Sequence, residues 1–188
     1  IGIGGISMSA LAVMLKEKGF IVSGYDKNES ETTVRLEKLG IPVNRPNDLE
    51  ECDIAVVSSA IADDDPIKVR LVGMKKAVVS RGWLLARLAE CYPMSVGVAG
   101  THGKTTTTSM AALVLMEAKK DPTVSVGGIL PEIGGNLRIG HSDTFITEAC
   151  EYTNSFLSFF PKISIVLNVD ADHLDFFKDI DDIRSSFH

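Results

Sequence analysis

The chain has 188 residues, of which 45% are apolar and 23% are charged, and 25 acidic against 19 basic residues give a formal net charge of −6. This acidic balance argues against a general nucleic-acid binder and against a polybasic membrane-surface protein, because both need a basic face. No stretch approaches the roughly 18 consecutive apolar residues of a membrane span, so we expect no membrane insertion. Three scattered cysteines without a Cys-x-x-Cys pair favour a reducing, cytoplasmic compartment over a disulfide scaffold or a zinc module.

The first half of the chain alternates between helix and strand signals. Apolar residues recur at helical spacing in two segments that each end at a glycine, as helices often do. Short runs rich in apolar and β-branched residues predict strands between them. The predicted helices cover residues 8–18 and 31–39, the predicted strands cover 20–25, 53–58 and 77–80, and a turn is predicted over 63–66. Alternating strands and helices imply a parallel sheet covered on both faces.

A second α/β unit follows a predicted connecting helix over residues 83–91. Its predicted strands cover 94–99, 145–147 and 163–167, its predicted helix covers 105–119, and the glycine-rich stretch 127–140 is predicted as a loop or hairpin. We therefore predict two α/β domains, a Rossmann-like parallel-sheet domain over residues 1–92 and a P-loop domain over 93–188. Because the chain has no initial Met and stops within a helix-like pattern over 180–188, we expect it to be part of a longer protein.

The strongest motif is Gly-Thr-His-Gly-Lys-Thr-Thr at residues 100–106, between a predicted strand and a predicted helix. Such a loop turns main-chain N–H groups toward phosphate oxygens, and the start of the helix adds partial positive charge. Lys104 is placed to reach the β- and γ-phosphates, and the Thr105 hydroxyl to ligate Mg²⁺. The strict P-loop pattern has a glycine where this chain has Val98, so Gly100 takes the tight turn. A glycine-rich turn that happens to contain a lysine is the alternative.

A second glycine loop opens the chain, where Gly2, Gly4 and Gly5 precede Ser7, and Asp26 ends the next predicted strand. This order nearly matches the dinucleotide fingerprint, in which glycines approach a pyrophosphate and an acid about 20 residues further on binds a ribose hydroxyl. The motif fits a diphosphate-linked nucleoside without indicating which one. A glycine turn without a ligand stays open as the alternative.

Acidic residues follow two other predicted strands. Glu148 comes directly after the strand that ends at Thr147, where P-loop folds commonly place a carboxylate that holds Mg²⁺. The segment 168–175 carries three acids and His173, a set that suits a second metal ion or an acid–base site. A solvated surface acid and an acid-decorated helix start are the respective alternatives.

Taken in this order, the motifs resemble those of the Mur ligases of peptidoglycan synthesis, and the resemblance covers essentially the whole chain. In that family the first domain binds a UDP-sugar, the central domain binds ATP, and a third domain helps to bind the amino acid. The resemblance implies that the UDP-sugar is contacted by Gly4, Gly5, Ser7, Asp26, Ser58 and Ser59. It implies that ATP is contacted by Gly100, Thr101, His102, Gly103, Lys104, Thr105 and Thr106.

The resemblance also implies metal-binding and catalytic roles. Thr105 and Glu148 would hold a first Mg²⁺ and His173 a second, and the catalytic residues would be Lys104 and His173. Asn168 matches a recurrent family position to which no contact is assigned. Many members have an aspartate where this chain has Cys150, a difference that leaves Glu148 in place.

The implied reaction is ATP-dependent amide formation in two steps. The lactyl carboxylate of UDP-N-acetylmuramic acid would attack the γ-phosphate, giving an acyl phosphate and ADP, and the amine of L-alanine would then displace phosphate. A recycling ligase of the same superfamily that accepts a tripeptide is the nearest alternative. An NAD-binding oxidoreductase or a regulatory nucleotide-binding module is a more distant one. The sequence leaves open whether the chain forms a homo-oligomer.

Overall fold

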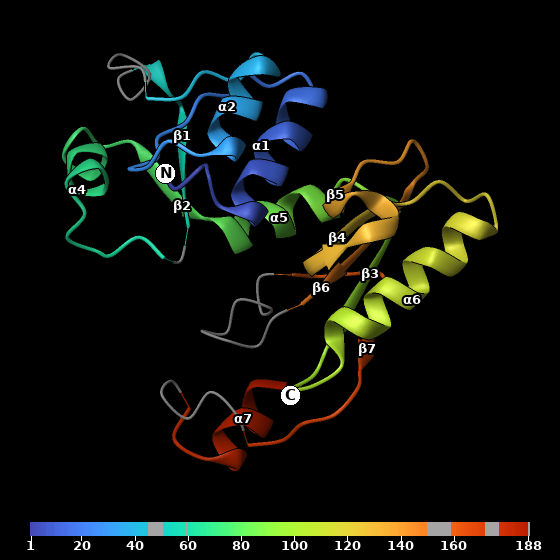
Figure 1. The fold of residues 1–188 in the computed structure, drawn as a ribbon. Coiled ribbons are helices and arrows are strands. Elements are labelled where there is room, and N and C mark those ends of the chain that lie inside the picture. The colour runs from blue at the N-terminus through green and yellow to red at the C-terminus, as the bar shows by residue number, and fades with distance from the viewer. Residues whose placement is uncertain (45–50, 59, 150–158, 172–176, 188) are drawn as a thin grey trace. The chain divides into compact units, whose positions relative to one another are not determined.

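This computed structural model describes residues 1–44, 51–58, 60–149, 159–171 and 177–187 (Figure 1). The chain divides into two compact units, Ile1–Leu84 and Leu85–His188, and each is described by itself. In the described part of the chain, none of the helices is both long enough and apolar enough to cross a membrane.

The first unit carries helices around a small parallel sheet. Its elements are α1 (Ile6–Glu17), α2 (Glu31–Lys38), β1 (Ile54–Val57), α4 (Pro66–Gly73) and β2 (Ala77–Ser80). Strands β1 and β2 pair in parallel from Ile54↔Ala77 to Val57↔Ser80. A parallel bridge also joins Gly24 to Val43. The predicted helices and the last two predicted strands of this unit are therefore confirmed.

The predicted strand over residues 20–25 was wrong, because that segment forms only the bridge at Gly24. Its main chain meets other segments at few points: the N–H groups of Gly2 and Ile3 share the carbonyl of Tyr25, and Gly24 pairs with the segment around Val43. A short apolar run becomes a strand only when successive groups find a ladder partner. Residues 20–25 therefore pack against their neighbours without forming such a ladder.

The first unit is packed around two apolar clusters. One joins Ile3 on the opening loop to residues of α1, α2 and the segment after α2, and its buried members are Ile3, Ala12, Leu36, Ile41 and Val43. The other joins the first residue to β1 and α4, and its buried members are Ile1, Ala55, Val57 and Leu71. Residues on both sides of the glycine loop are therefore anchored, which fixes where the loop lies.

Side-chain caps start two of these helices. Ser30 and Thr33 form a reciprocal capping box at the start of α2. The Asp65 carboxylate accepts the N–H groups of Ile67 and Lys68 at the start of α4, where Pro66 occupies the first turn. The turn predicted over 63–66 is therefore the entrance to a helix.

The second unit is built on a five-stranded sheet. Its elements are α5 (Arg81–Glu90), which begins in the first unit, β3 (Met94–Ala99), α6 (Lys104–Glu117), β4 (Thr123–Leu130), the 3-10 turn η1 (Pro131–Ile133), β5 (Gly135–Arg138), β6 (Thr144–Glu148), β7 (Ile163–Val166) and α7 (Ile180–Phe187). The strand order is β5-β4-β6-β3-β7, and every pair is parallel except the β4–β5 hairpin. The predicted elements are confirmed, and the glycine-rich stretch belongs largely to this hairpin.

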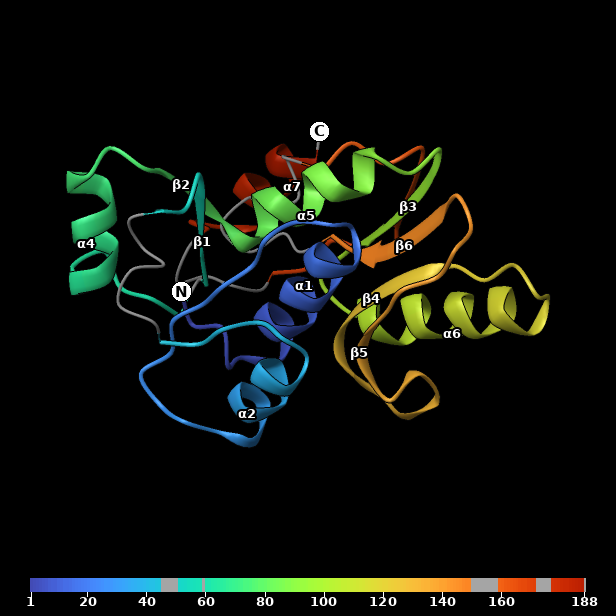
Figure 2. The same cartoon turned by 90° about the horizontal axis from the view of Figure 1, so that it is seen from above.

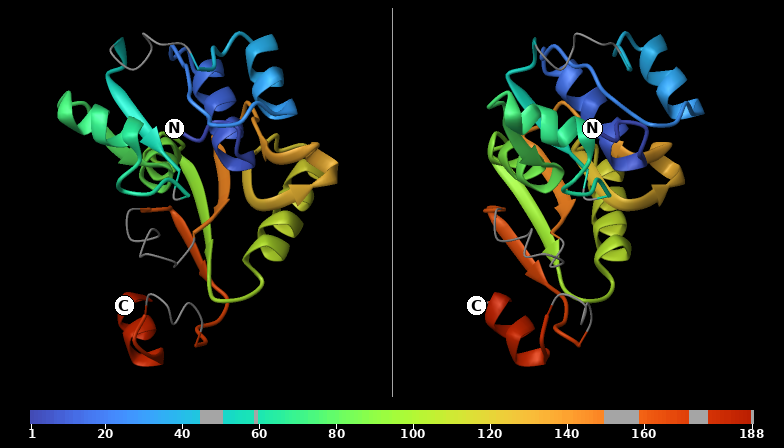
Figure 3. Two further views of the ribbon diagram at one scale, coloured as in Figure 1. Left: turned by 60° about the vertical axis from the view of Figure 1, so that its left-hand side comes forward. Right: turned by 90° about the vertical axis from the view of Figure 1, so that its left-hand side faces the viewer.

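The order of the strands decides which loops meet. Both views in Figure 3 show β3 between β6 and β7, in agreement with the pairing. Helix α6 contacts β3, β4 and β6, and Figure 2 shows it beside β4. Because β3, β6 and β7 are parallel, the residues that follow Ala99, Glu148 and Val166 lie at one edge of the sheet.

A buried polar cluster closes the opposite end of this sheet. The Tyr92 ring stacks on Phe145 with centroids 5.2 Å apart, and its hydroxyl lies 3.2 Å from Thr123 Oγ1. That threonine oxygen also accepts the Gly140 N–H at 3.0 Å and donates to the Gly140 carbonyl at 3.2 Å. On α6, by contrast, the buried Thr108 hydroxyl has no hydrogen-bond partner in the described part of the chain.

These two buried threonines give a matched pair of substitutions with opposite expected signs. Thr123→Val deprives the Tyr92 hydroxyl and the Gly140 N–H of their partner, so we expect the free energy of unfolding to fall by about 2 kcal/mol. Thr108→Val removes an unsatisfied hydroxyl at equal volume, so we expect a rise of up to about 1 kcal/mol. Urea denaturation measures both changes, and equal effects of the two substitutions would contradict this account.

A charged cluster holds the β4–β5 hairpin against the end of α6. The Asp121 carboxylate accepts from the Arg138 guanidinium at 2.5 Å and from the N–H and Nδ1 of His141 at 2.9 and 3.0 Å. These hydrogen bonds, that of Arg138 first, lower the pKa of Asp121 from 3.8 to about 2.

Because the pKa of Asp121 is lowered, its ionised form contributes to the stability of the fold, and this contribution is lost in acid. Above a pH of about 4 the ionised Asp121 contributes its full stability, which is lost as the pH falls toward about 2. Asp121→Asn, which fits the left-handed φ of 46°, should melt earlier than the native chain at about pH 6. The gap in melting temperature should narrow on acidification to about pH 2, and a gap independent of pH would contradict the assignment.

Candidate functional site

The loop between β3 and α6 is shaped by two glycines with positive φ. Gly100 has φ +131° and Gly103, at the start of α6, has φ +84°. A Cβ at Gly100 would lie 3.0 Å from the Asn168 carbonyl oxygen, so a side chain there would press on the neighbouring segment. Both conformations are strained for residues with a side chain. The glycines therefore allow the chain to turn from strand to helix within a few residues.

Lys104 places its ammonium group inside this loop. Its Nζ donates to the carbonyls of Gly100 at 2.5 Å and Thr101 at 3.0 Å. The first intrahelical bond of α6 runs from the Thr107 N–H to the Gly103 carbonyl, so the preceding N–H groups have no acceptor within the helix. A lysine and a helix start at one loop form a site of positive potential that suits phosphate.

Two residues predicted as ligands of one Mg²⁺ are brought together. The Thr105 hydroxyl donates to Glu148 Oε2 at 3.0 Å, and the Gly127 N–H donates to Oε1 at 2.5 Å. Glu148 is in place because it pairs with Val98, near the end of β3. A hydroxyl and a carboxylate are ligands that Mg²⁺ accepts together with phosphate and water. The part of the chain that the structure describes contains no cluster of three or more His, Cys, Asp or Glu suited to a metal.

The hydrogen bond from Gly127 to Glu148 was not predicted from the sequence. Gly127 lies in β4, and a Cβ there would lie 2.7 Å from Glu148 Oε2. The neighbouring Gly128 has more room, since a Cβ there would lie 3.6 Å from Thr105 Cγ2. The available signal was the glycine pair itself, because glycine inside a strand often marks a close approach.

Other predicted residues of the loop are placed as follows. Thr101 is buried, and its hydroxyl accepts the Asp170 N–H at 2.9 Å. His102 is exposed, and its N–H donates to the Asn168 side chain at 2.8 Å. Thr106 is exposed in the first turn of α6. His173 lies outside the described residues, so the second metal site stays a prediction.

In the first unit the structure gathers most of the predicted UDP-sugar residues. Asp26 Oδ2 accepts the Gly4 N–H at 2.8 Å, and Oδ1 accepts the Asn28 N–H at 3.1 Å. A Cβ at Gly2 would lie 3.3 Å from Ser58 Cβ, so this serine borders the loop. Asp26 thus organises the glycine loop, whatever else it binds.

Further residues support this loop. The Asn44 side chain accepts the Asp26 N–H at 2.9 Å, and a Cβ at Gly4 would lie 3.2 Å from the buried Thr33 Cγ2. Neither residue was predicted, because both are distant from the motif in sequence. Gly5 precedes α1 and its N–H donates to the Gly2 carbonyl at 3.2 Å, while Ser7 lies in the first turn of α1. Ser59 lies outside the described residues.

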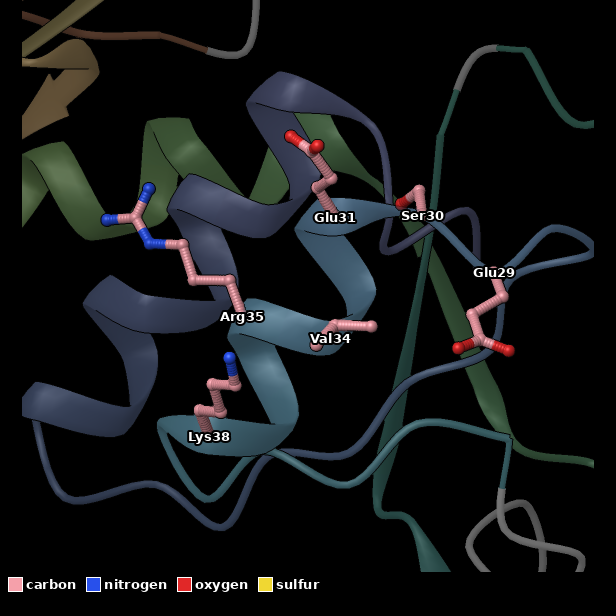
Figure 4. A pocket seen from close by; sticks show the side chains of 6 residues that line it. All are labelled: Glu29, Ser30, Glu31, Val34, Arg35 and Lys38. Carbon is pink, nitrogen blue, oxygen red and sulfur yellow. The ribbon is translucent and has the colours of Figure 1, made fainter.

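A hollow of about 540 Å³ lies over α2 (Figure 4). It is lined by Glu29, Ser30, Glu31, Val34, Arg35 and Lys38. Two acidic and two basic side chains are among its lining residues, and none of the predicted UDP-sugar residues lines it. It carries no part of the predicted site.

Family models match both halves of the chain. Residues 1–92 match "Mur ligase family, catalytic domain", and residues 98–187 match "Mur ligase middle domain". The chain belongs to the Mur ligase family.

Named relatives agree with this assignment. The UDP-N-acetylmuramate–L-alanine ligase of Lachnoclostridium phytofermentans is 50% identical over 192 residues, and that of Agathobacter rectalis is 52% identical over 191 residues. Each match covers 100% of this chain, and it covers 41% of the first protein and 42% of the second. The Mur ligase chain described here thus spans about two fifths of the length of these curated relatives.

Solved structures confirm the predicted α/β fold. The UDP-N-acetylmuramate–alanine ligase of Thermotoga maritima superposes with a TM-score of 0.84 at 34% identity, over 99% of this chain and 44% of that one. The UDP-N-acetylmuramate:L-alanyl-γ-D-glutamyl-meso-diaminopimelate ligase of Neisseria meningitides gives 0.85 at 31% identity, over 100% of this chain and 64% of that one.

The two glycines of β4 provide a test of how Glu148 is held. Gly127→Ala should displace the Glu148 carboxylate and weaken Mg²⁺-dependent nucleotide binding by about 10- to 100-fold. Gly128→Ala, whose Cβ meets only an ordinary contact, should bind within about threefold of the native protein. Calorimetric titration with ADP, with and without Mg²⁺, measures both, and equal losses in the two variants would count against the assignment.

Proposed function

We propose that this chain is part of a ligase that joins L-alanine to the lactyl carboxylate of UDP-N-acetylmuramic acid, while ATP is converted to ADP and phosphate. Residues 1–92 would form its UDP-sugar-binding domain, and 93–188 the first part of its ATP-binding domain. The observation that carries the proposal is the convergence of Lys104, Thr105 and Glu148 at one sheet edge. We place the reaction in the cytoplasm, in line with the scattered cysteines.

The choice of L-alanine is supported by the relatives' names. The curated relatives at about 50% identity are named as L-alanine ligases, whereas the Neisseria protein, whose name contains a tripeptide, is 31% identical. This comparison favours L-alanine over the tripeptide alternative.

In the proposed reaction the residues of the loop stabilise negative charge on the phosphoryl group that is transferred. The lactyl carboxylate oxygen bonds to the γ-phosphorus and the bond to ADP breaks, which gives an acyl phosphate. The amine of L-alanine then attacks the acyl carbon, phosphate leaves, and the amine loses a proton. Lys104 and the N–H groups at the start of α6 would stabilise the negative charge on the transferred phosphoryl group. Because the reactants bind side by side, positioning supplies much of the rate.

Thr105 and Glu148 are the residues that would hold Mg²⁺, and His173 is proposed to serve a second ion. Mg²⁺ bound there would neutralise charge on the terminal phosphates of ATP. Glu148 is oriented for this role by the Gly127 N–H and the Thr105 hydroxyl. Lys104, which donates to the loop carbonyls, would turn toward phosphate when the nucleotide enters.

The oxidoreductase alternative gains no support from the first unit. In a dinucleotide site the acid after the second strand binds a ribose hydroxyl. Here the oxygens of Asp26 accept main-chain N–H groups, one of which belongs to the glycine loop, so Asp26 has a role in shaping the loop that needs no dinucleotide. An NAD-binding reading also leaves the phosphate loop at residues 100–106 without a role.

The proposal is tested by phosphate release from the intact protein. We expect release to require ATP, UDP-N-acetylmuramic acid and L-alanine together, and the tripeptide to replace L-alanine poorly. Phosphate release that occurs with the tripeptide but not with L-alanine would overturn the proposal. Binding of NADH by a protein that does not bind the UDP-sugar would also overturn it.

A lysine pair shows whether Lys104 acts in the reaction. Lys104→Met should lower kcat by about 100-fold or more while UDP-sugar affinity is retained. Lys16→Met is the matched control, because Lys16 also donates to a main-chain carbonyl, that of Gly40 at 2.8 Å, and should keep native turnover. A native kcat in Lys104→Met would exclude the proposed role.

A further inference from the structure

The loop after β3 is joined to the segment after β7 by a series of hydrogen bonds. The ladder between the two strands continues one residue past the end of β7, because the Leu167 N–H donates to the carbonyl of Ala99, the last residue of β3, at 3.0 Å. The Thr101 N–H then donates to the Asn168 carbonyl at 3.2 Å. The Thr101 hydroxyl accepts the Asp170 N–H at 2.9 Å and donates to the Asp170 carbonyl at 3.3 Å.

The Asn168 side chain takes the place of a main-chain group in this series. Its Oδ1 accepts the His102 N–H at 2.8 Å, and its Nδ2 donates to the His102 carbonyl at 3.0 Å. A carboxamide carries a donor and an acceptor side by side, as a pairing main chain does. Aspartate has the acceptor without the donor, and alanine has neither.

The pairing of Asn168 with His102 restrains the part of the loop that has the most conformational freedom. His102 stands between Gly100 and Gly103, the two residues with positive φ, so the segment is flanked by the most permissive residues of the loop. Asn168 fixes the main chain of His102 on both its N–H and its carbonyl. The N–H groups of α6 that precede that of Thr107 have no acceptor within the helix, so a phosphate at the start of α6 would meet them there.

We propose that Asn168 is a positioning residue for the nucleotide, which holds the main chain of His102 so that the loop is ready for phosphate before ATP binds. This inference rests on the proposed function, since it assigns ATP to the loop. The hydrogen bonds of Asn168 with His102 and of Thr101 with Asp170 together form a clamp between the two segments. A loop ordered in advance costs less conformational entropy on binding, so the clamp should increase nucleotide affinity.

Hydrogen exchange of the intact protein tests the clamp without any reaction. In Asn168→Ala the amides of residues 101–103 should exchange faster than in the native protein, while those of the β4–β5 hairpin keep their native rates. Native exchange rates at residues 101–103 in this variant would overturn the proposal.

Steady-state kinetics then separates positioning from a general loss of structure. Asn168→Ala and Asn168→Asp should each raise the KM for ATP about tenfold or more, with the KM for the UDP-sugar within about twofold. Thr101→Val should raise the KM for ATP in the same direction, and Thr101→Ser, which keeps the hydroxyl, should restore it. This second pair decides the matter if the Asn168 variants do not fold.

The failures of the two proposals are distinguishable. If the native protein releases no phosphate from ATP with its UDP-sugar and L-alanine, the proposed function fails. If the native protein is active and the Asn168 and Thr101→Val variants keep its KM for ATP, the positioning role alone fails. A lower melting temperature with an unchanged KM for ATP would likewise assign Asn168 to folding and overturn its positioning role.

Discussion

The parallel pairing of β3 with β6 on one side and β7 on the other determines where the chemistry of this chain lies. The register sets Glu148 opposite Val98 and Val166 opposite Ala99, so the loop that follows β3 receives a carboxylate from one neighbour and a carboxamide from the other. A slip by one residue would turn every side chain of a strand to the opposite face. Phe145 and Ile146 are both buried and point to opposite faces of β6, so such a slip would misplace two core side chains.

Side chains that bind main-chain groups appear in both units of the protein. Asp26 accepts the N–H of Gly4, and Glu148 accepts the N–H of Gly127. In each case a Cβ on the glycine would lie within 3 Å of a carboxylate oxygen, at 2.9 Å and 2.7 Å respectively. Glycine is thus needed at these positions for the approach of an acid, in addition to any freedom of φ. Asp26 thereby holds the opening glycine loop, and Glu148 joins β4 to Thr105 in the first turn of α6.

The sequence allowed the local features to be predicted but not the contacts between distant segments. Helices and the β-branched strands follow from periodicity, and Lys104, Thr105 and Glu148 follow from their places after strands. The error at residues 20–25 arose because an apolar run does not reveal whether a ladder partner exists. The contacts of Asn168 with His102 join residues 66 positions apart, and no local pattern predicts them. Gly127 stood in a glycine-rich stretch that was expected as loop or hairpin.

The Thr105–Glu148 hydrogen bond is compatible with a cation between the loop and β6. A hydroxyl has one donor and two acceptor lone pairs, so Thr105 can keep donating its hydrogen bond to Glu148 while one of its lone pairs faces the ion. Each carboxylate oxygen accepts more than one bond, so Glu148 retains lone pairs after binding Thr105 and Gly127. Binding of a cation by these two residues would therefore need little rearrangement of their hydrogen bonds. The larger change would fall on Lys104, whose ammonium would exchange the carbonyls of Gly100 and Thr101 for phosphate oxygens in the role proposed for it.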